Sequence, residues 1–166
     1  MIIFVTGRRD AGKTELARAL FEELSAAGIK TGGICSPAEF YRGRKCRYFA
    51  QNLKTGNKKF LLSVAGGPKT DRAGFRFANA VLARCAACKA VIIDEMGPLE
   101  LLGRGFFRQA EKLARRRNAA LLITVRPGMA GAMAAKLKVK YYHACDISGN
   151  KRLVRYRAGK HHLRPG

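Results

Sequence analysis

Residues 7–14 have the sequence Gly7-Arg8-Arg9-Asp10-Ala11-Gly12-Lys13-Thr14, which fits the pattern G-x-x-x-x-G-K-[ST] in full. Glycines in this pattern let the backbone adopt positive φ, so that successive N–H groups turn toward phosphate oxygens. The lysine neutralises the terminal phosphates of a nucleotide, and the hydroxyl ligates Mg²⁺. We therefore expect a phosphate-binding loop, with positive φ at Gly7 and Gly12, phosphate contact at Lys13 and a metal bond at Thr14.

The residues on either side of this loop support that interpretation over an ordinary strand-to-helix turn. Residues 2–5 form a short apolar run that is typical of a strand buried on both faces. The spacing of apolar side chains after the loop predicts a helix from Lys13 to a cap at Gly28. These apolar side chains are Leu16, Ala17, Leu20, Phe21 and Leu24. The start of such a helix adds unpaired amides and a positive dipole end beside the phosphates.

Strands and helices alternate along the rest of the chain. The patterns predict strands at 30–35, 90–94 and 119–125, weaker strands at 141–145 and 153–156, helices at 75–89, 106–117 and 129–138, and a β-hairpin within 44–64. Such alternation is typical of a mainly parallel sheet with helices on both faces. We therefore predict an α/β fold, with one domain over residues 1–147 and a basic strand or tail over 148–166, whose end could be disordered.

Two adjacent acids, Asp94 and Glu95, end the apolar run of residues 90–93. The carboxyl ends of parallel strands meet at the edge of the sheet that also carries the phosphate loop. Asp94 would then reach the Mg²⁺ shell through water, and Glu95 would orient or deprotonate an attacking water. The alternative is a pair of solvated carboxylates at a strand end, which the phosphate loop upstream disfavours.

The segment Asp94–Leu101 continues as Asp-Glu-Met-Gly-Pro-Leu-Glu-Leu. Together with residues 7–14 and with Lys30-Thr31-Gly32-Gly33-Ile34, it resembles the small P-loop nucleoside-triphosphatases, a family known from thermophiles and as the cancer-related nucleoside-triphosphatase. The resemblance covers roughly residues 1–128. It implies a RecA-like P-loop core, a three-layer sandwich with an added β-hairpin, and Mg²⁺-dependent hydrolysis of nucleoside triphosphates with broad base tolerance.

The same resemblance assigns roles to individual residues of the segment. It implies that Asp94 supports Mg²⁺ and that Glu95 is the base, while Glu100 matches a family acid that could brace the loop or the metal shell. Gly97 would permit a tight turn beside the terminal phosphate, and Pro98 would stiffen that turn.

Three groups of candidate site residues follow. The candidate nucleotide-binding residues are Gly7, Arg8, Arg9, Asp10, Ala11, Gly12, Lys13, Thr14, Asp94, Glu95 and Gly97. The candidate catalytic residues are Glu95, Lys13 and Arg126, and the candidate Mg²⁺ ligands are Thr14 and Asp94.

Two of these candidates need comment. Arg126 follows the strand predicted at 119–125, so it could stabilise charge on the transferred phosphoryl group or be an ordinary surface arginine. Phosphate would repel the carboxylate of Asp10 unless this side chain turns outward or pairs with Arg8 or Arg9.

The chain is strongly basic, with 33 Lys and Arg against 11 Asp and Glu and a net charge of +22. Residues 101–166 hold 16 of the basic and 2 of the acidic side chains. This imbalance favours a second hypothesis, an RNA- or DNA-binding module whose ATP hydrolysis the polymer stimulates. The run Arg115–Arg117 and the tail 148–166 are its candidate surfaces, and a solvated basic surface is the alternative.

A third hypothesis is a small-molecule or nucleotide kinase, because such enzymes share the phosphate loop. A kinase needs an acceptor pocket and usually a lid of arginines, for which Arg42, Arg44 and Arg47 are candidates. Transfer of phosphate to an acceptor, without free phosphate, would distinguish it from a hydrolase.

Cysteine content and hydropathy predict a cytosolic protein. The chain has five cysteines, no export signal and no apolar run near the roughly 20 residues that span a bilayer, so we expect reduced thiols. Cys85 and Cys88 could form half of a metal site, but their Ala-rich helical context favours buried thiols.

Overall fold

The computed structural model describes residues 1–64, 67, 69–149 and 152–158. Its centre is a sheet with the strand order β10-β9-β1-β8-β7-β2-β4-β5-β6, and β3 pairs with β4 outside this path. The strands are β1 (Ile2–Thr6), β2 (Thr31–Cys35), β3 (Ala38–Tyr41), β4 (Arg44–Asn52), β5 (Lys58–Ser63), β6 (Lys69–Thr70), β7 (Ala90–Met96), β8 (Ala120–Val125), β9 (Tyr141–Asp146) and β10 (Val154–Arg157).

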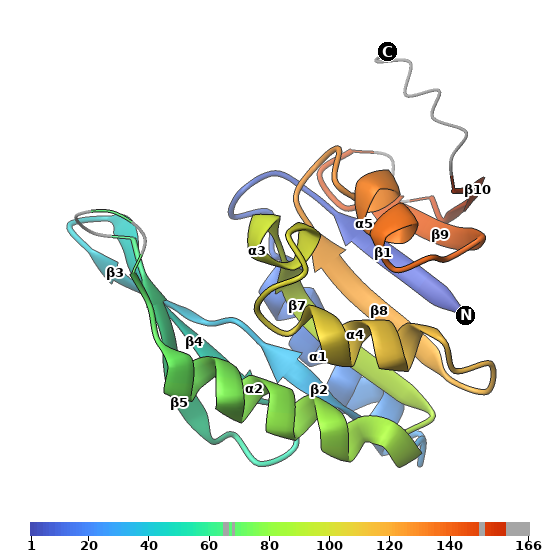
Figure 1. The fold of residues 1–166 in the computed structure, drawn as a ribbon, viewed down its shortest axis with the longest axis horizontal. Coiled ribbons are helices and arrows are strands. Elements are labelled where there is room, and N and C mark those ends of the chain that lie inside the picture. Colours follow the sequence, from blue (N-terminus) through green and yellow to red (C-terminus); the bar gives the residue numbers. More distant parts are fainter. Residues whose placement is uncertain (65–66, 68, 150–151, 159–166) are drawn as a thin grey trace.

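Helices cover both faces of this sheet. They are α1 (Lys13–Ala26), α2 (Arg72–Arg84), α3 (Pro98–Leu101), α4 (Phe107–Ala114) and α5 (Ala130–Lys136), with a 3₁₀ turn at Cys85–Ala87. In Figure 1, α1 lies behind the parallel strands, whereas α2 and α4 lie in front of them. The predicted three-layer α/β sandwich is confirmed. None of the helices in the described ranges is long and apolar enough to cross a membrane.

The parallel part of the sheet holds the core and sets the position of the two motifs. The strands β9, β1, β8, β7 and β2 pair in parallel. Phe4, Ile93 and Ile123, one from each of three neighbouring strands, are fully buried, as continuous apolar runs between two helical layers should be. Because β8 lies between β1 and β7, the strand before the phosphate loop and the strand that carries the two acids are not neighbours.

The added hairpin is larger than predicted. β4 and β5 form the antiparallel pair expected within 44–64, and β3 adds a second hairpin to β4 through Arg42 and Gly43. In Figure 1 these strands extend away from the parallel core as an arm. The periodicity did not predict β3, whose four residues are too few to show alternation.

The helix boundaries also differ from those predicted. The helix expected at 75–89 begins at Arg72, because the Asp71 carboxylate accepts a hydrogen bond from the Gly74 amide at 2.7 Å and caps the first turn. The helix expected at 106–117 covers Phe107–Ala114. The short helix α3 was not predicted.

Part of the predicted tail 148–166 belongs to the sheet. β10 pairs antiparallel with β9, and the ring of Tyr156 stacks on that of Tyr142 with centroids 5.4 Å apart. Residues 150–151 and 159–166 lie outside the described residues.

Candidate active site

A cleft of about 960 Å³ brings together most of the predicted site residues at the carboxyl ends of β1, β7 and β8. The predicted residues that line it are Arg9, Asp10, Gly12, Lys13, Thr14, Asp94, Glu95 and Arg126. Gly7, Arg8 and Ala11 belong to the loop but do not line this cleft, and Gly97 lines a smaller pocket beside it.

The two glycines of the phosphate loop serve different purposes. Gly12 has φ of 86° and caps α1 at Lys13, as predicted. The expectation of positive φ at Gly7 is wrong, because glycine is needed there for space: a Cβ on Gly7 would lie 2.8 Å from Cγ1 of Ile147. The second positive φ in the loop, 63°, occurs at Asp10, which has to tolerate a conformation that favours glycine.

The lysine of the loop is held across the loop itself. Nζ of Lys13 donates hydrogen bonds to the carbonyl oxygens of Gly7 and Arg8, each at 2.8 Å. The amide of Arg8 donates to Oγ of Ser148 at 2.6 Å, which ties the loop to the segment after β9. Lys13 therefore lines the cleft with its ammonium group already at the loop, where phosphates would enter.

Asp94 is buried and held by neutral donors from the residue that follows β2 and from β8. Its side chain is 1% exposed, Oδ2 accepts from the Ser36 amide at 3.0 Å, and Oδ1 accepts from Oγ1 of Thr124 at 2.6 Å. Oγ of Ser36 also donates to the main-chain oxygen of Asp94 at 2.9 Å. Sequence reasoning missed Ser36 and Thr124, although a polar residue within an apolar strand, as Thr124 is, was a usable signal.

Mg²⁺ fits this arrangement of oxygen atoms. Within the ranges that the structure describes, no cation pairs with the Asp94 carboxylate, and a buried carboxylate without a counter-charge is costly. Thr14 lies in the same cleft, so a hydroxyl and a carboxylate are available to a hard cation. Thr14 and Asp94, with phosphate oxygens and water, would hold it.

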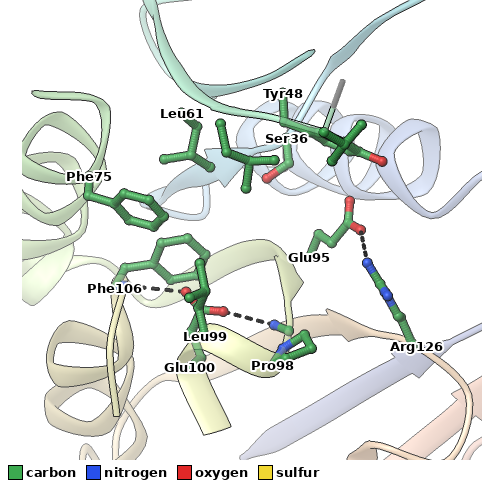
Figure 2. Close-up of a pocket in the computed structure, with 13 residues that line it drawn as sticks. Ser36, Tyr48, Leu61, Phe75, Glu95, Pro98, Leu99, Glu100, Phe106 and Arg126 are labelled. Atoms are coloured by element: carbon green, nitrogen blue, oxygen red, sulfur yellow. Dashed lines mark hydrogen bonds and ion pairs between the residues drawn. The ribbon is translucent and has the colours of Figure 1, made fainter. Parts of the chain in front are cut away.

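Glu95 leaves the regular path of β7. Its φ is 64°, at an irregularity in the pairing of β7 with β8 between Ile93 and Met96. Its amide donates to Oγ1 of Thr124 at 2.7 Å, while Oε1 of its carboxylate lies 3.8 Å from Nη2 of Arg126 (Figure 2). A non-glycine residue in this conformation is strained, and strain of this kind is common where a side chain has to be aimed at a reactive site.

The surroundings of Glu95 raise the pKa of its carboxyl above the usual value. Burial is the largest cause and the charge of Asp94 adds to it, while Arg126, Lys45 and Lys13 act in the opposite direction. A carboxylate with a raised pKa is a stronger base, and three cations around it keep the ionised form accessible.

Glu100 braces the segment that follows β7. It is 3% exposed, and its carboxylate accepts hydrogen bonds from the amides of Gly97 at 2.9 Å and Phe106 at 3.4 Å (Figure 2). Burial raises its pKa to about 7, against these hydrogen bonds, which lower it. Of the two roles left open for Glu100, the structure supports the brace.

The role expected for Gly97 needs correction. Its φ is −135°, an extended conformation open to any residue, so no tight glycine turn exists there. Gly97 instead precedes α3 and donates its amide to Glu100. It contributes to a pocket of about 120 Å³ that shares Glu95 and Arg126 with the lining of the large cleft and is also lined by Phe75 and Phe106.

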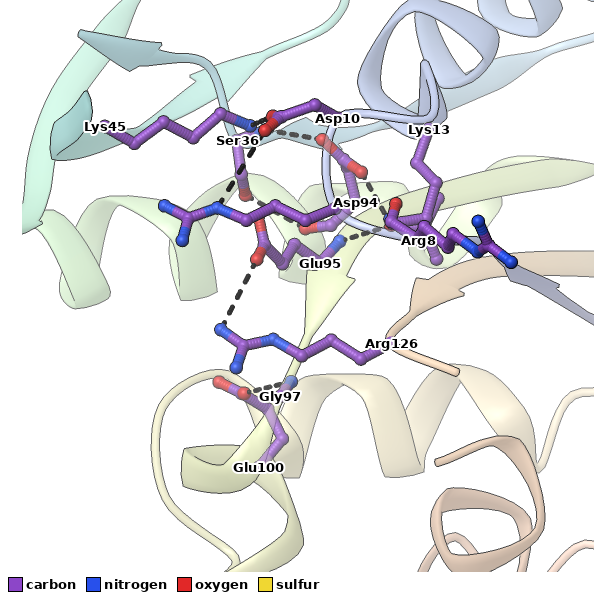
Figure 3. A network of polar contacts seen from close by, with 12 residues as sticks. Arg8, Asp10, Lys13, Ser36, Lys45, Asp94, Glu95, Gly97, Glu100 and Arg126 are labelled. Carbon is purple, nitrogen blue, oxygen red and sulfur yellow. Dashed lines mark hydrogen bonds and ion pairs between the residues drawn. The ribbon is translucent and has the colours of Figure 1, made fainter. Parts of the chain in front are cut away.

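Asp10 turns toward the hairpin. Its carboxylate lies 3.9 Å from Nε of Arg9, one of the two partners predicted, and 2.5 Å from Nζ of Lys45 on β4 (Figure 3). Lys45 lines the cleft and was not predicted as a site residue, because its approach depends on the bend of the hairpin.

The two cysteines of the 3₁₀ turn region pack against the sheet. A Cβ on Gly32 of β2 would lie 2.8 Å from Sγ of Cys85 and 3.1 Å from Sγ of Cys88. Burial raises the pKa of Cys85 to about 12, so this thiol stays protonated. These observations favour buried structural thiols over a metal site.

Comparison with known proteins identifies the family of this chain. A family model described as NTPase matches residues 2–152. The nucleoside-triphosphatase THEP1 of Methanothermobacter thermautotrophicus is 29% identical over 121 residues, which are 68% of this chain and 70% of that protein. Across eight proteins of that name, the match covers 57–76% of their length.

Two solved structures share the fold. The crystal structure of THEP1 from Aquifex aeolicus has a TM-score of 0.71 at 21% identity and covers 90% of this chain and 91% of its own. The solution structure of a human cancer-related nucleoside triphosphatase has a TM-score of 0.65 at 24% identity and covers 82% of both chains. The resemblance of the segment Asp94–Leu101 predicted this family. Because the family model spans most of the sequence, the chain belongs to the NTPase family.

Proposed function

We propose that this enzyme is a Mg²⁺-dependent phosphohydrolase that converts a nucleoside triphosphate and water to the diphosphate and phosphate. The observation that carries the proposal is the position of Glu95, whose carboxylate shares one cleft with Lys13 and Thr14 of the phosphate loop. Its main chain is fixed by Thr124, while its side chain remains partly exposed, with 30% of its surface accessible. A water molecule can therefore reach a base that stands beside the terminal phosphate.

The reaction follows from these positions. A water oxygen attacks the γ-phosphorus in line, Glu95 accepts a proton from that water, and the bond from the γ-phosphorus to the β–γ bridging oxygen breaks. Lys13 and the loop amides stabilise the charge that develops on the phosphate oxygens, and Arg126 can do so from the end of β8. When bound at Thr14 and Asp94, Mg²⁺ supplies further neutralisation of the phosphates.

Broad base tolerance is part of the proposal. The residues that the proposal places in the reaction act on phosphates, metal or water, and none of these roles depends on the identity of the base. A cytosolic location stays a prediction.

Release of free phosphate tests this function. We expect Mg²⁺-dependent release from ATP, GTP, CTP and UTP alike, and its loss in Glu95→Gln, which keeps the shape of the side chain but cannot accept the proton. Nucleotide binding should survive in that variant. A Glu95→Gln enzyme as fast as the wild type would contradict the assignment of the base, and equal rates with EDTA would contradict the metal.

A nucleic-acid partner is a second proposal, and the arm supports it better than the run Arg115–Arg117. The guanidinium of Arg116 donates to the carbonyl oxygens of Cys85 and Cys88, at 3.2 and 2.9 Å, and Arg115 pairs with Glu111, so both already have structural partners. On the arm, Tyr41 is 65% exposed, with the Arg42 guanidinium 5.3 Å from its ring. Exposed rings among cations are typical of surfaces that bind single strands.

The polymer hypothesis makes a different prediction for the same assay. Phosphate release should rise on addition of RNA or single-stranded DNA, and binding of the polymer should weaken steeply with salt. Absence of binding at low salt would remove this proposal and leave the first intact.

The structure does not support the arginine lid expected for a kinase, since none of Arg42, Arg44 and Arg47 is among the residues that line the cleft.

A further inference from the structure

The phosphate loop contains an acid where an anion has to bind. Asp10 lies within residues 7–14, has φ of 63° and lines the cleft beside Lys13 and Thr14. Its carboxylate would face the charge of a triphosphate at close range, and like charges in a cleft oppose binding. The structure relieves this conflict through Lys45, whose Nζ lies 2.5 Å from Oδ1 of Asp10.

Lys45 comes to the loop from the opposite side of the cleft. It lies on β4, directly across from Phe40 of β3, and its Nζ is 5.8 Å from the centre of the Phe40 ring. Both side chains line the cleft together with Tyr48. Figure 3 shows the Lys45 side chain extending from the arm to Asp10 of the loop.

Neighbouring cations on the arm are placed differently. The side chain of Lys45 is only 21% exposed, whereas that of Arg47, on the same strand, is 62% exposed and lies 3.8 Å from Glu39. Arg47 and Glu39 do not line the cleft. The arm therefore contributes one cation, Lys45, to the lining of the site.

The charge of Lys45 reaches the reacting end of the cleft. Lys45 is one of three cations, with Arg126 and Lys13, whose charge lowers the pKa of Glu95. Burial lowers the pKa of Lys45 itself, but the hydrogen bond to Asp10 and the charges of Asp10, Tyr48 and Glu95 together raise it by more, so this side chain stays charged. The same bond lowers the pKa of Asp10. Both partners are thus ionised at neutral pH, and the pair can be broken by a competing anion.

We propose that Lys45 is a second phosphate-binding cation, which exchanges the carboxylate of Asp10 for the terminal phosphate of a nucleoside triphosphate. Phe40 and Lys45 then form a polyphosphate subsite on the side of the cleft that the arm provides, next to Asp10 of the phosphate loop. Asp10 holds Lys45 in the cleft until the ligand arrives, and a chain of three phosphates carries enough negative charge to displace it. This inference rests on the proposed nucleotide site, but not on hydrolysis.

Equilibrium binding tests the subsite without turnover. We would measure, by calorimetry in low salt, the affinity for inorganic tripolyphosphate, for ADP and for a non-hydrolysable ATP analogue. Lys45→Met should weaken the binding of tripolyphosphate and of the analogue by about tenfold, and that of ADP much less. Arg47→Met is the matched control, because it removes one cation from the same strand outside the cleft and should change affinity by less than about twofold.

The partner variant tests the exchange itself. Asp10→Asn keeps a side chain that tolerates positive φ and should tighten tripolyphosphate binding by about fivefold, while Glu39→Gln, which removes an acid from the outer side of the arm, should not. In a Lys45→Met background the gain from Asp10→Asn should be smaller, because no ion pair remains to be broken and only the repulsion between the Asp10 carboxylate and the phosphates is removed. Thermal unfolding would confirm that all the variants fold.

The outcomes separate the claims. A Lys45→Met protein that binds like Arg47→Met, or that loses ADP as strongly as tripolyphosphate, would overturn the subsite. An equal gain from Asp10→Asn with and without Lys45 would overturn the exchange. If the wild type shows the predicted binding pattern but releases no phosphate from any nucleotide, the subsite stands and the proposed hydrolysis fails.

Discussion

The hydroxyl of Thr124 donates a hydrogen bond to Oδ1 of Asp94 at 2.6 Å and accepts one from the amide of Glu95 at 2.7 Å. One buried side chain on β8 thus fixes both acids of β7. The acid that would support the metal and the acid that would accept the proton are held in one geometry by a group that touches neither phosphate nor water in the proposed reaction.

Replacement of this hydroxyl should therefore affect both stability and rate. Thr124→Val keeps the shape but leaves the Glu95 amide without its acceptor and one oxygen of Asp94 without its donor, at a cost of about 1–3 kcal/mol in the free energy of unfolding. Urea unfolding and phosphate release would measure the two effects. Thr124→Ser keeps the hydroxyl and should retain most of both, and a Val variant that is as stable and as fast as the wild type would contradict the role.

The strained backbone of Glu95 predicts that stability and activity separate at this position. Glu95→Ala and Glu95→Gly both remove the carboxylate and should both be inactive, but only glycine fits φ of 64° without strain. The Gly variant should then be more stable than the Ala variant by about 1 kcal/mol. Denaturant unfolding of the pair decides this, and a Gly variant less stable than Ala would show that the positive φ carries no strain.

Arg126 should set the acidic limb of the pH profile. A base works only when it is deprotonated, so activity rises as the pH passes the pKa of Glu95. Arg126 lowers that pKa, and Arg126→Gln should raise it and move the acidic limb of kcat/KM to higher pH. Arg115→Gln, which breaks an ion pair with Glu111 on α4, is the control and should leave the limb in place. An unchanged limb in Arg126→Gln would argue against the influence of Arg126 on Glu95.

Glu100 predicts a pH dependence of stability. Its pKa is about 7 in the folded protein, against 4.5 for the free side chain. Between these values the folded state binds more protons than the unfolded state, so the contribution of Glu100 to stability is full below pH 4.5 and falls as the pH rises through 7. The loss would amount to about 3 kcal/mol between those limits.

Comparison with an uncharged side chain isolates this effect. Glu100→Gln cannot ionise, and its stability should fall less between pH 5 and pH 8 than that of the wild type. Urea unfolding at both pH values measures the difference. Parallel losses in the two proteins would mean that Glu100 is already ionised when folded.

Local patterns predicted the parts of the site that are local. Residues 7–14 and the pair Asp94-Glu95 each lie within a few positions of a strand end, so strand direction alone brought them to one edge of the sheet. Lys45 could not be placed in this way. Its contact with Asp10 spans 35 positions and depends on the angle at which the arm leaves the sheet.

The errors have related causes. Gly7 and Gly97 were both predicted to serve through backbone freedom, yet Gly7 is required by the proximity of Ile147 and Gly97 is extended. The presence of a glycine in a sequence does not show whether the position needs a backbone conformation open to glycine or has no room for a side chain. The sequence analysis missed α3 because four residues are too few to show a helical period. The first turn of this helix is stabilised by the buried carboxylate of Glu100, which accepts a hydrogen bond from the Gly97 amide.

The strand order gives β8 a task that its own sequence does not reveal. Neighbouring strands are about 4.8 Å apart, so β8 holds the phosphate-loop strand and the acid-bearing strand at about twice that separation. Deletion of a single residue within β8 would leave both motifs unaltered, yet it would turn Thr124 to the other face of the sheet. A chain can therefore contain an intact phosphate loop and an intact acid pair and still be inactive, because the spacing and alignment of these motifs are set by a strand that contains neither.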